Sequence, residues 1–312
     1  KVKPRLVIVQ GDTTTSFAAA LAAFYLQIPI AHVEAGLRTG NIHSPFPEEI
    51  NRVFISKMRS LHIAPTPVNV LNLLKEGLPA EKIFCVGNTV VDALQQITKR
   101  IKQNTLPISP FVKKLVQNSA QENKKLVLLT THRRVSFDGG IVRVLKTIKS
   151  FARQHPNVLF FFPVHPNPNV QRAVAEANLS EQANIICHTP LQYTDLVYVL
   201  SATDLVITDS GGIQEEAVCL GKPVLILREE TERIEAVWEG LGTLVGTNEQ
   251  KLRAALFSWI QKPKIFQQKF LYGNGDSCKK ILQILLNQPE IFVPEELAAF
   301  NKTCNTSMHY CD

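Results

Sequence analysis

The feature that most constrains the fold is a repeated alternation of short apolar runs with longer segments of helical periodicity. This alternation is typical of βα units, in which parallel strands form a sheet that is covered by helices. We therefore predict an α/β fold. Strands are expected at residues 6–10, 28–33, 61–65, 83–86, 126–130, 158–164, 185–187, 205–208 and 224–227. Helices are expected at 15–26, 66–76, 88–102, 142–154, 168–177, 193–201, 213–220 and 276–286.

Domain limits are indicated by a polar, proline-containing connector at residues 103–110, after which a second βα series begins. We predict a first Rossmann-like domain with a linker helix over 1–107 and a second over 108–275. Residues 276–312 are expected to form a crossover helix, which could return to the first domain, and a polar tail.

Composition excludes several classes of protein. Hydrophobic residues make up 45% and charged residues 20% of the 312 residues, as in globular proteins. No apolar run approaches the ~20 residues that span a bilayer, and no leader pattern marks the chain for secretion. We therefore expect a cytoplasmic protein without membrane insertion. The six cysteines contain no Cys-x-x-Cys pair, which favours buried reduced thiols over metal ligands.

The formal net charge of +7 suits an anionic ligand, although a solvated basic surface is the simpler explanation. Basic residues do not alternate with aromatic ones in any run, so nucleic acid is not an expected partner.

Two carboxylates follow neighbouring expected strands. Asp12 comes directly after the first strand, and Glu34 comes at the end of the next. Ligands of open sheets bind outside the carboxyl ends of the strands, and adjacent carboxylates can divide acid and base roles. Simpler explanations are a helix cap at Asp12 or a following Thr, and an ion pair between Glu34 and Arg38.

A third acidic group, Glu48, stands at an expected helix start after Pro47. It is one turn before Arg52, so an ordinary i,i+4 ion pair is the simpler explanation. In the second half, His132 and Arg133 follow a strand with Arg134. Such a cationic cluster suits phosphate binding or proton transfer.

The strongest local motif is the segment TDSGGIQEEA at residues 208–217. A strand ends, Gly211 and Gly212 turn the chain, and a helix begins, which places backbone N–H groups where a diphosphate can bind. Glu216 is positioned to reach ribose hydroxyls. The simpler alternative is a glycine turn capped by Ser210. The spacing is neither that of a P-loop nor that of a dinucleotide fingerprint. Arg233 again follows a strand.

These segments, in this order, resemble the non-hydrolysing UDP-N-acetylglucosamine 2-epimerases. The match extends over about residues 5–285. Its parts are GDTTT at 11–15, HVEAGLRTG at 32–40, PEE at 47–49, NR at 51–52, GNTV at 87–90, DA at 92–93, HRR at 132–134, HPNP at 165–168, DSGGIQEE at 209–216 and TER at 231–233.

The resemblance implies two Rossmann-like domains in the arrangement of GT-B glycosyltransferases. It also implies interconversion of UDP-GlcNAc and UDP-ManNAc by inversion at C2, through elimination and re-addition of UDP. No cofactor or metal is implied, and a homodimer is expected. The implied catalytic residues are Asp12, Glu34, Glu48 and His132. The implied substrate-binding residues are Arg52, Arg133, Leu191, Leu196, Ser210, Gly211, Gly212, Glu216 and Arg233.

Three departures from the family pattern bear on these expectations. The family's initial strand and its Gly-Thr-Arg-Pro-Glu turn are not found before Leu6, so the first domain is expected to be incomplete. Val135 replaces an acidic residue, and Leu196 stands where Phe is frequent. Alternative functions are therefore an inactive remnant that binds UDP-sugar, or a GT-B glycosyltransferase, which would not need three proton-transfer carboxylates.

Overall fold

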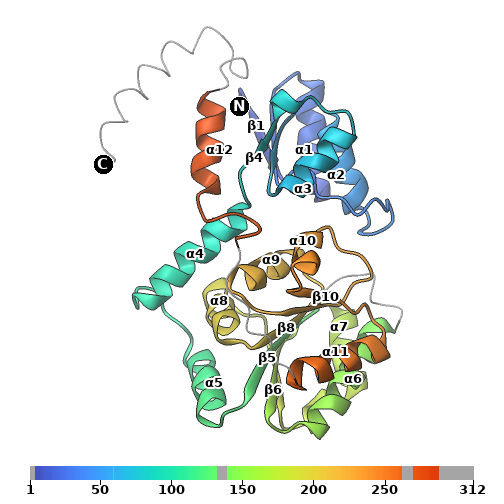
Figure 1. Cartoon of the computed structure of the whole chain (residues 1–312), viewed down its shortest axis with the longest axis vertical. Helices are drawn as coiled ribbons and strands as arrows, with labels where there is room; N and C mark the ends of the chain where they lie inside the picture. The colour runs from blue at the N-terminus through green and yellow to red at the C-terminus, as the bar shows by residue number, and fades with distance from the viewer. Residues whose placement is uncertain (1–3, 59, 132–138, 262–269, 288–312) are drawn as a thin grey trace. The chain divides into compact units, whose positions relative to one another are not determined.

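The structure, a computed structural model, describes residues 4–58, 60–131, 139–261 and 270–287 (Figure 1). Within these residues the chain forms two compact units. Unit 1 contains the residues up to Thr89 together with those from Gly273 onward, and unit 2 runs from Val90 to Tyr272. Each unit has a parallel sheet with helices packed against it, which confirms the predicted α/β class.

The described part of unit 1 has a four-stranded sheet in the order β1-β2-β3-β4. All neighbouring strands are parallel. The strands are β1 (Val7–Gln10), β2 (Ile30–Val33), β3 (Ser60–Ala64) and β4 (Ile83–Cys85). The helices are α1 (Thr14–Tyr25), α2 (Glu48–Ser56), α3 (Pro67–Lys75), the short 3₁₀ helix η1 (Ala80–Lys82) and α12 (Ser277–Leu286).

Helices cover both faces of this sheet (Figure 1). Side chains of a strand alternate between faces, so Ile30 packs with α1 and α2, whereas Ala31 and Val33 pack on the opposite face. That second face is covered by Ile281 and Leu285 of α12. The chain therefore returns to unit 1 at its last described helix.

The described part of unit 2 has a six-stranded parallel sheet in the order β10-β9-β8-β5-β6-β7. Its strands are β5 (Lys125–Thr130), β6 (Val158–Pro163), β7 (Ile185–His188), β8 (Leu205–Thr208), β9 (Val224–Ile226) and β10 (Gly242–Leu244). Its helices are α4 (Thr89–Lys102), α5 (Pro110–Gln121), α6 (Gly140–Gln154), α7 (Pro168–Ala177), the 3₁₀ helix η3 (Leu179–Glu181), α8 (Tyr193–Ala202), α9 (Gly211–Cys219), α10 (Ile234–Trp238) and α11 (Glu249–Gln261).

Two hydrophobic clusters fill the faces of the unit 2 sheet. One joins α6, α7 and α11 to alternate residues of β5 and β6. The other joins α4, α5, α8, α9 and α10 to the intervening residues of the same strands. α4, which the sequence analysis grouped with the first domain, packs here through Val91 and Leu94.

Every strand expected from the sequence is present, with ends shifted by one or two residues at most. β10, α5, α10 and α11 were not expected. β10 and α10 are too short for their periodicity to be recognised, but α5 has a recognisable start, because Ser109 caps it and Pro110 follows. None of the described helices is both long and apolar enough to cross a membrane.

Candidate active site

Asp12 and Glu34 follow β1 and β2, which are neighbours in the unit 1 sheet. The Gly11 N–H donates to the Val33 carbonyl at 3.0 Å, which fixes the two strand ends side by side. Glu34 Oε2 lies only 3.3 Å from the point where a Gly11 side chain would begin. Glu34 also has a φ of 66°, an uncommon conformation for a residue other than glycine, and such strain clusters at functional sites.

The Asp12 side chain does not cap the following helix. Thr13 is the N-cap of α1, and its Oγ1 accepts a hydrogen bond from the Ser16 N–H at 3.2 Å. Of the two capping alternatives raised by the sequence, the threonine is therefore the cap, and the Asp12 carboxylate remains available for another role.

Arg52 of α2 joins the Asp12 loop to its own helix. Its Nη2 bonds Asp12 Oδ2, and its Nη1 bonds Glu49 Oε2 at 3.2 Å. The simpler i,i+4 explanation for Glu48 is therefore wrong, because the helical partner of Arg52 is Glu49. Arg38 likewise pairs with Glu76, at 2.6 and 3.0 Å, and not with Glu34.

Glu48 and Glu49 have different surroundings although they are adjacent. Glu49 is 2% exposed, and its carboxylate also accepts the N–H groups of Thr39 and Gly40 at 3.1 and 3.0 Å. Glu48 is half-buried, and its side chain makes no hydrogen bond within the described residues. Residues three and four apart share a helix face, and Asn51, three residues after Glu48, donates from Nδ2 to the Asp12 carbonyl at 2.9 Å. The half-buried carboxylates of Asp12 and Glu48 thus lie at one end of the unit 1 sheet.

His32 supports this arrangement from within β2. Its ring is fully buried, and its Nε2 lies 2.8 Å from the Gly11 carbonyl oxygen. A carbonyl only accepts, so Nε2 carries the proton. Desolvation by burial lowers the pKa of His32 from 6.5 to about 3, and it therefore acts here as a neutral donor.

In unit 2, the turn between β8 and α9 is stabilised from β5. Thr131 Oγ1 donates to Asp209 Oδ2 at 2.8 Å, and the Ser210 N–H donates to Thr208 Oγ1 at 2.9 Å. Ser210 makes no side-chain capping bond to α9, so the serine-cap alternative is wrong. The Ser210 side chain therefore does not occupy the first N–H groups of α9. A helix N-terminus binds an anion through such N–H groups, so they must not be capped by a side chain.

Gly211 and Gly212 have different neighbours. A side chain at Gly211 would begin 2.6 Å from the guanidinium of Arg233, so only glycine allows that close contact. Beyond its chain neighbours and the backbone of its own helix, no described atom lies within 4 Å of the corresponding position at Gly212.

Arg233 packs against Gly211 at the start of α9, and its side chain is 7% exposed. Its Nε donates to Glu215 Oε1 at 2.8 Å, and its Nη1 bonds Glu232. Its main-chain N–H donates to Thr231 Oγ1 at 3.2 Å. The two carboxylates hold the guanidinium in one position, which an exposed arginine would not keep.

Glu216 on α9 is 4% exposed, and the Tyr193 hydroxyl donates to its Oε1 at 2.7 Å. Burial raises the pKa of Glu216, and the Tyr193 hydrogen bond partly opposes this effect by stabilising the ionised form. The tyrosine was not among the expected site residues. A signal was nevertheless present, because Tyr193 follows β7 as the other candidates follow their strands.

Of the remaining expected site residues, the structure describes some and not others. Leu191 and Leu196 are partly buried against the second cluster of the unit 2 core. His132 and Arg133 lie outside the described residues. Glu49, Glu215 and Glu232 were not expected either, because the sequence pattern does not reveal which carboxylate an arginine pairs with.

The described residues contain no group of three or more His, Cys, Asp and Glu side chains that is arranged to hold a metal ion. Cys219 is buried, as expected, but Cys85, Cys187 and Cys278 are exposed, so the expectation of burial is wrong for these three.

Comparison with known proteins identifies the family. The sequence model of the UDP-N-acetylglucosamine 2-epimerase family matches residues 1–286. The chain is 45% identical over 291 residues to the UDP-N-acetylglucosamine 2-epimerase of Yersinia pestis, with 91% of this chain and 76% of the relative covered. It is 44% identical over 289 residues to the Campylobacter jejuni enzyme of the same name, with 91% and 75% covered.

Solved structures agree. The UDP-GlcNAc 2-epimerase of Neisseria meningitidis bound to UDP-GlcNAc superposes with a TM-score of 0.84 at 41% identity, covering 91% of this chain and 76% of the other. The Methanocaldococcus jannaschii enzyme in complex with UDP-GlcNAc and UDP gives 0.77 at 35% identity, covering 90% and 75%. The predicted resemblance is confirmed: this chain belongs to the UDP-N-acetylglucosamine 2-epimerase family, a family of isomerases.

Proposed function

We propose that this chain interconverts UDP-GlcNAc and UDP-ManNAc by inverting the configuration at C2 of the sugar. The observation that carries the proposal is the placement of Asp12 and Glu34 at adjacent strand ends, with the α2 helix that bears Glu48 bonded to the Asp12 loop. Relatives that are 39–45% identical to the chain bear the name UDP-N-acetylglucosamine 2-epimerase, which supports the proposal.

Inversion at C2 requires proton transfer on both faces of the ring. A base removes the C2 proton, the C1–O bond breaks, and UDP leaves with the bonding electrons to give a 2-acetamidoglucal. An acid then protonates C2 from the opposite face while a UDP oxygen bonds to C1. Half-buried carboxylates are suited to such transfers, because their surroundings can tune the pKa of each one. Asp12, Glu34 and Glu48 are the proposed acid/base groups, with His132 as a further candidate near the phosphates.

Unit 2 is proposed to hold the UDP group. The N-terminus of α9 at Gly211 and Gly212, which Ser210 does not cap, suits the diphosphate. The Glu216 carboxylate, oriented by Tyr193, suits the ribose hydroxyls. Arg233 is proposed to act mainly by fixing the start of α9, since two carboxylates already bind its guanidinium.

Incubation with UDP-GlcNAc in deuterated water tests the proposal. The expected result is incorporation of deuterium at C2 together with the appearance of UDP-ManNAc, both followed by NMR. UDP binding without exchange at C2 would instead support the inactive remnant, and transfer of GlcNAc to an acceptor would support a glycosyltransferase.

Asp12→Asn provides the matched variant. Asparagine retains an acceptor for Arg52 but cannot transfer a proton, so exchange should be lost while UDP affinity stays close to that of the parent chain. Glu81→Gln is the control, because Glu81 is an exposed carboxylate of unit 1 outside the site. Exchange by Asp12→Asn at the parent rate would remove Asp12 from the catalytic set.

A homodimer and a cytoplasmic location are further proposals. Light scattering of the purified chain tests the first, and a mass equal to one chain at all concentrations would contradict it.

A further inference from the structure

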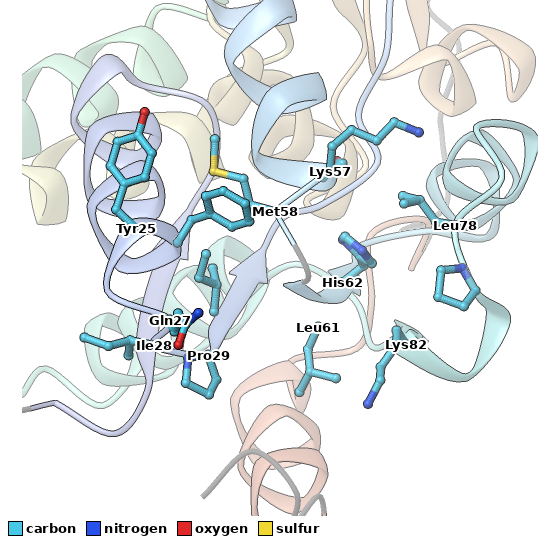
Figure 2. Close-up of a pocket in the computed structure, with 14 residues that line it drawn as sticks. Tyr25, Gln27, Ile28, Pro29, Lys57, Met58, Leu61, His62, Leu78 and Lys82 are labelled. Carbon is cyan, nitrogen blue, oxygen red and sulfur yellow. The ribbon is translucent and has the colours of Figure 1, made fainter. Parts of the chain in front are cut away.

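Unit 1 contains an open pocket of about 1140 Å³ at the amino-terminal edge of its sheet (Figure 2). Its lining residues come from the segments before the strands and from the first half of the strands, as Ile30 begins β2 and Lys82 immediately precedes β4. Asp12 and Glu34 follow the strands and therefore lie at the opposite edge. The pocket is thus separate from the candidate acid/base groups.

The lining of the pocket is apolar with a cationic component. Side chains such as Met58, Leu61 and Leu78 form most of the wall, and Lys57 and Lys82 are its charged members. None of the lining residues in the described part of the chain is an aspartate or glutamate. The Lys57 ammonium donates to the Glu76 carbonyl oxygen at 2.7 Å and forms no ion pair with a carboxylate among the described residues. Such a wall favours a ligand that is apolar over most of its surface and carries a negative charge.

His62 gives a second, independent indication of a ligand. It is 2% exposed and lines the pocket, and its ring Nδ1 is buried without a hydrogen-bond partner among the described residues. Figure 2 shows its ring between Lys57 and Lys82. A neutral imidazole has one N–H donor and one acceptor nitrogen, and a buried polar group without a partner is costly. A ligand oxygen beside the ring would satisfy it.

We propose that this pocket is a binding site for a small amphipathic anion, with its apolar body against Met58 and Leu61 and its carboxylate, sulfonate or phosphate group near His62 and Lys82. We expect the site to bind independently of UDP, because it lies at the other edge of the unit 1 sheet from the candidate acid/base groups.

Fluorescence titration with 1-anilinonaphthalene-8-sulfonate, an aromatic sulfonate, tests the proposal on the whole chain in the presence of excess UDP. The expected result is saturable binding at one site. His62→Phe keeps the ring but removes both nitrogens, and Lys82→Met removes the charge, so each should weaken binding about fivefold, the effect of one hydrogen bond or charge contact. Lys75→Met is the matched control, since Lys75 is an exposed lysine of unit 1 that does not line the pocket.

Three outcomes would overturn the proposal: no saturable binding, displacement of the probe by UDP, or equal affinity in the parent chain and in both pocket variants. Circular dichroism establishes that each variant is folded. Should His62→Phe fail to fold, Lys82→Met decides the question alone, because Lys82 is the half-buried last residue of the short 3₁₀ helix η1.

Discussion

The Arg52 guanidinium bonds the Asp12 carboxylate, although in the sequence Arg52 stands one turn after Glu48. The pairing leaves Glu48 without a hydrogen bond in the described part of the chain, whereas Glu49 takes the second side of the guanidinium at 3.2 Å. Two adjacent glutamates thus have separate roles: Glu49 fixes Arg52 and the loop at Thr39, and Glu48 remains available for proton transfer.

Substitution of the two glutamates should therefore separate activity from stability. Glu49→Gln removes the charge that compensates a guanidinium that is 2% exposed, and should lower the free energy of unfolding by about 2–4 kcal/mol. Glu48→Gln should change it by no more than about 0.5 kcal/mol, as at other surface positions, but should reduce C2 exchange at least about 100-fold. Urea unfolding and the deuterium-exchange assay measure the two effects. Equal loss of stability in both variants would contradict the assignment.

The sequence predicts the site residues whose positions follow from the sheet topology, but not those whose roles depend on side-chain packing. Asp12, Glu34 and Ser210 were found because a parallel sheet brings the ends of its strands to one edge, whatever the details of packing. The partner of Arg52 could not be found in this way. Glu48 and Glu49 both lie within one turn of it, and the choice between them depends on how deeply each side chain is buried.

Likewise, some elements of the fold are marked in the local sequence and others are not. Strands such as β6 are marked by continuous apolar runs, and helices such as α7 by Pro168 after a capping Asn167. β10 has only the residues Gly242–Leu244, and it is a strand because its backbone pairs with β9. The local sequence there carries no period-2 pattern, so its structure is decided by tertiary contacts that a sequence pattern does not contain.

Tyr193→Phe should weaken UDP binding about five- to tenfold, the effect of one hydrogen bond to a charged group. Without the hydroxyl, the pKa of the buried Glu216 carboxyl rises further, so its ionised form is lost at a higher pH than in the parent chain. The loss of affinity should therefore grow as the pH is lowered. Calorimetric titration with UDP at several pH values measures this. Tyr198→Phe, on the same helix, is the control, and an equal effect in both variants would exclude a specific role for Tyr193.

The two glycines at the start of α9 should respond differently to a single methyl group. Gly211→Ala places Cβ 2.6 Å from the Arg233 guanidinium, which is itself held by Glu215 and Glu232, so stability should fall by about 1–3 kcal/mol. Gly212→Ala meets no described atom within 4 Å outside its chain neighbours and its own helix backbone, so stability should be unchanged or slightly raised, since alanine favours a helix.

UDP affinity gives the complementary result for these variants. If the diphosphate approaches the backbone of α9, the Gly212→Ala methyl group occupies its space and should weaken UDP binding at least about tenfold. Thermal unfolding and calorimetric titration of the two variants provide the comparison. Full UDP affinity in a stably folded Gly212→Ala would place the diphosphate elsewhere.

Stability should fall as the pH is lowered below about 6.5, in part because of His32. Its pKa is near 6.5 when the chain is unfolded and is lowered to about 3 by burial in the folded state. Between these values the unfolded chain binds one more proton at this residue, so the contribution to stability is complete above pH 6.5 and is lost as the pH falls. The slope is about 1.4 kcal/mol per pH unit.

His32→Gln retains an N–H that can donate to the Gly11 carbonyl but does not titrate. Urea unfolding from pH 7 to pH 4.5 should therefore show a slope smaller by that amount in His32→Gln, even if this variant is less stable at pH 7. The same slope in both chains would mean that His32 is protonated in the folded state.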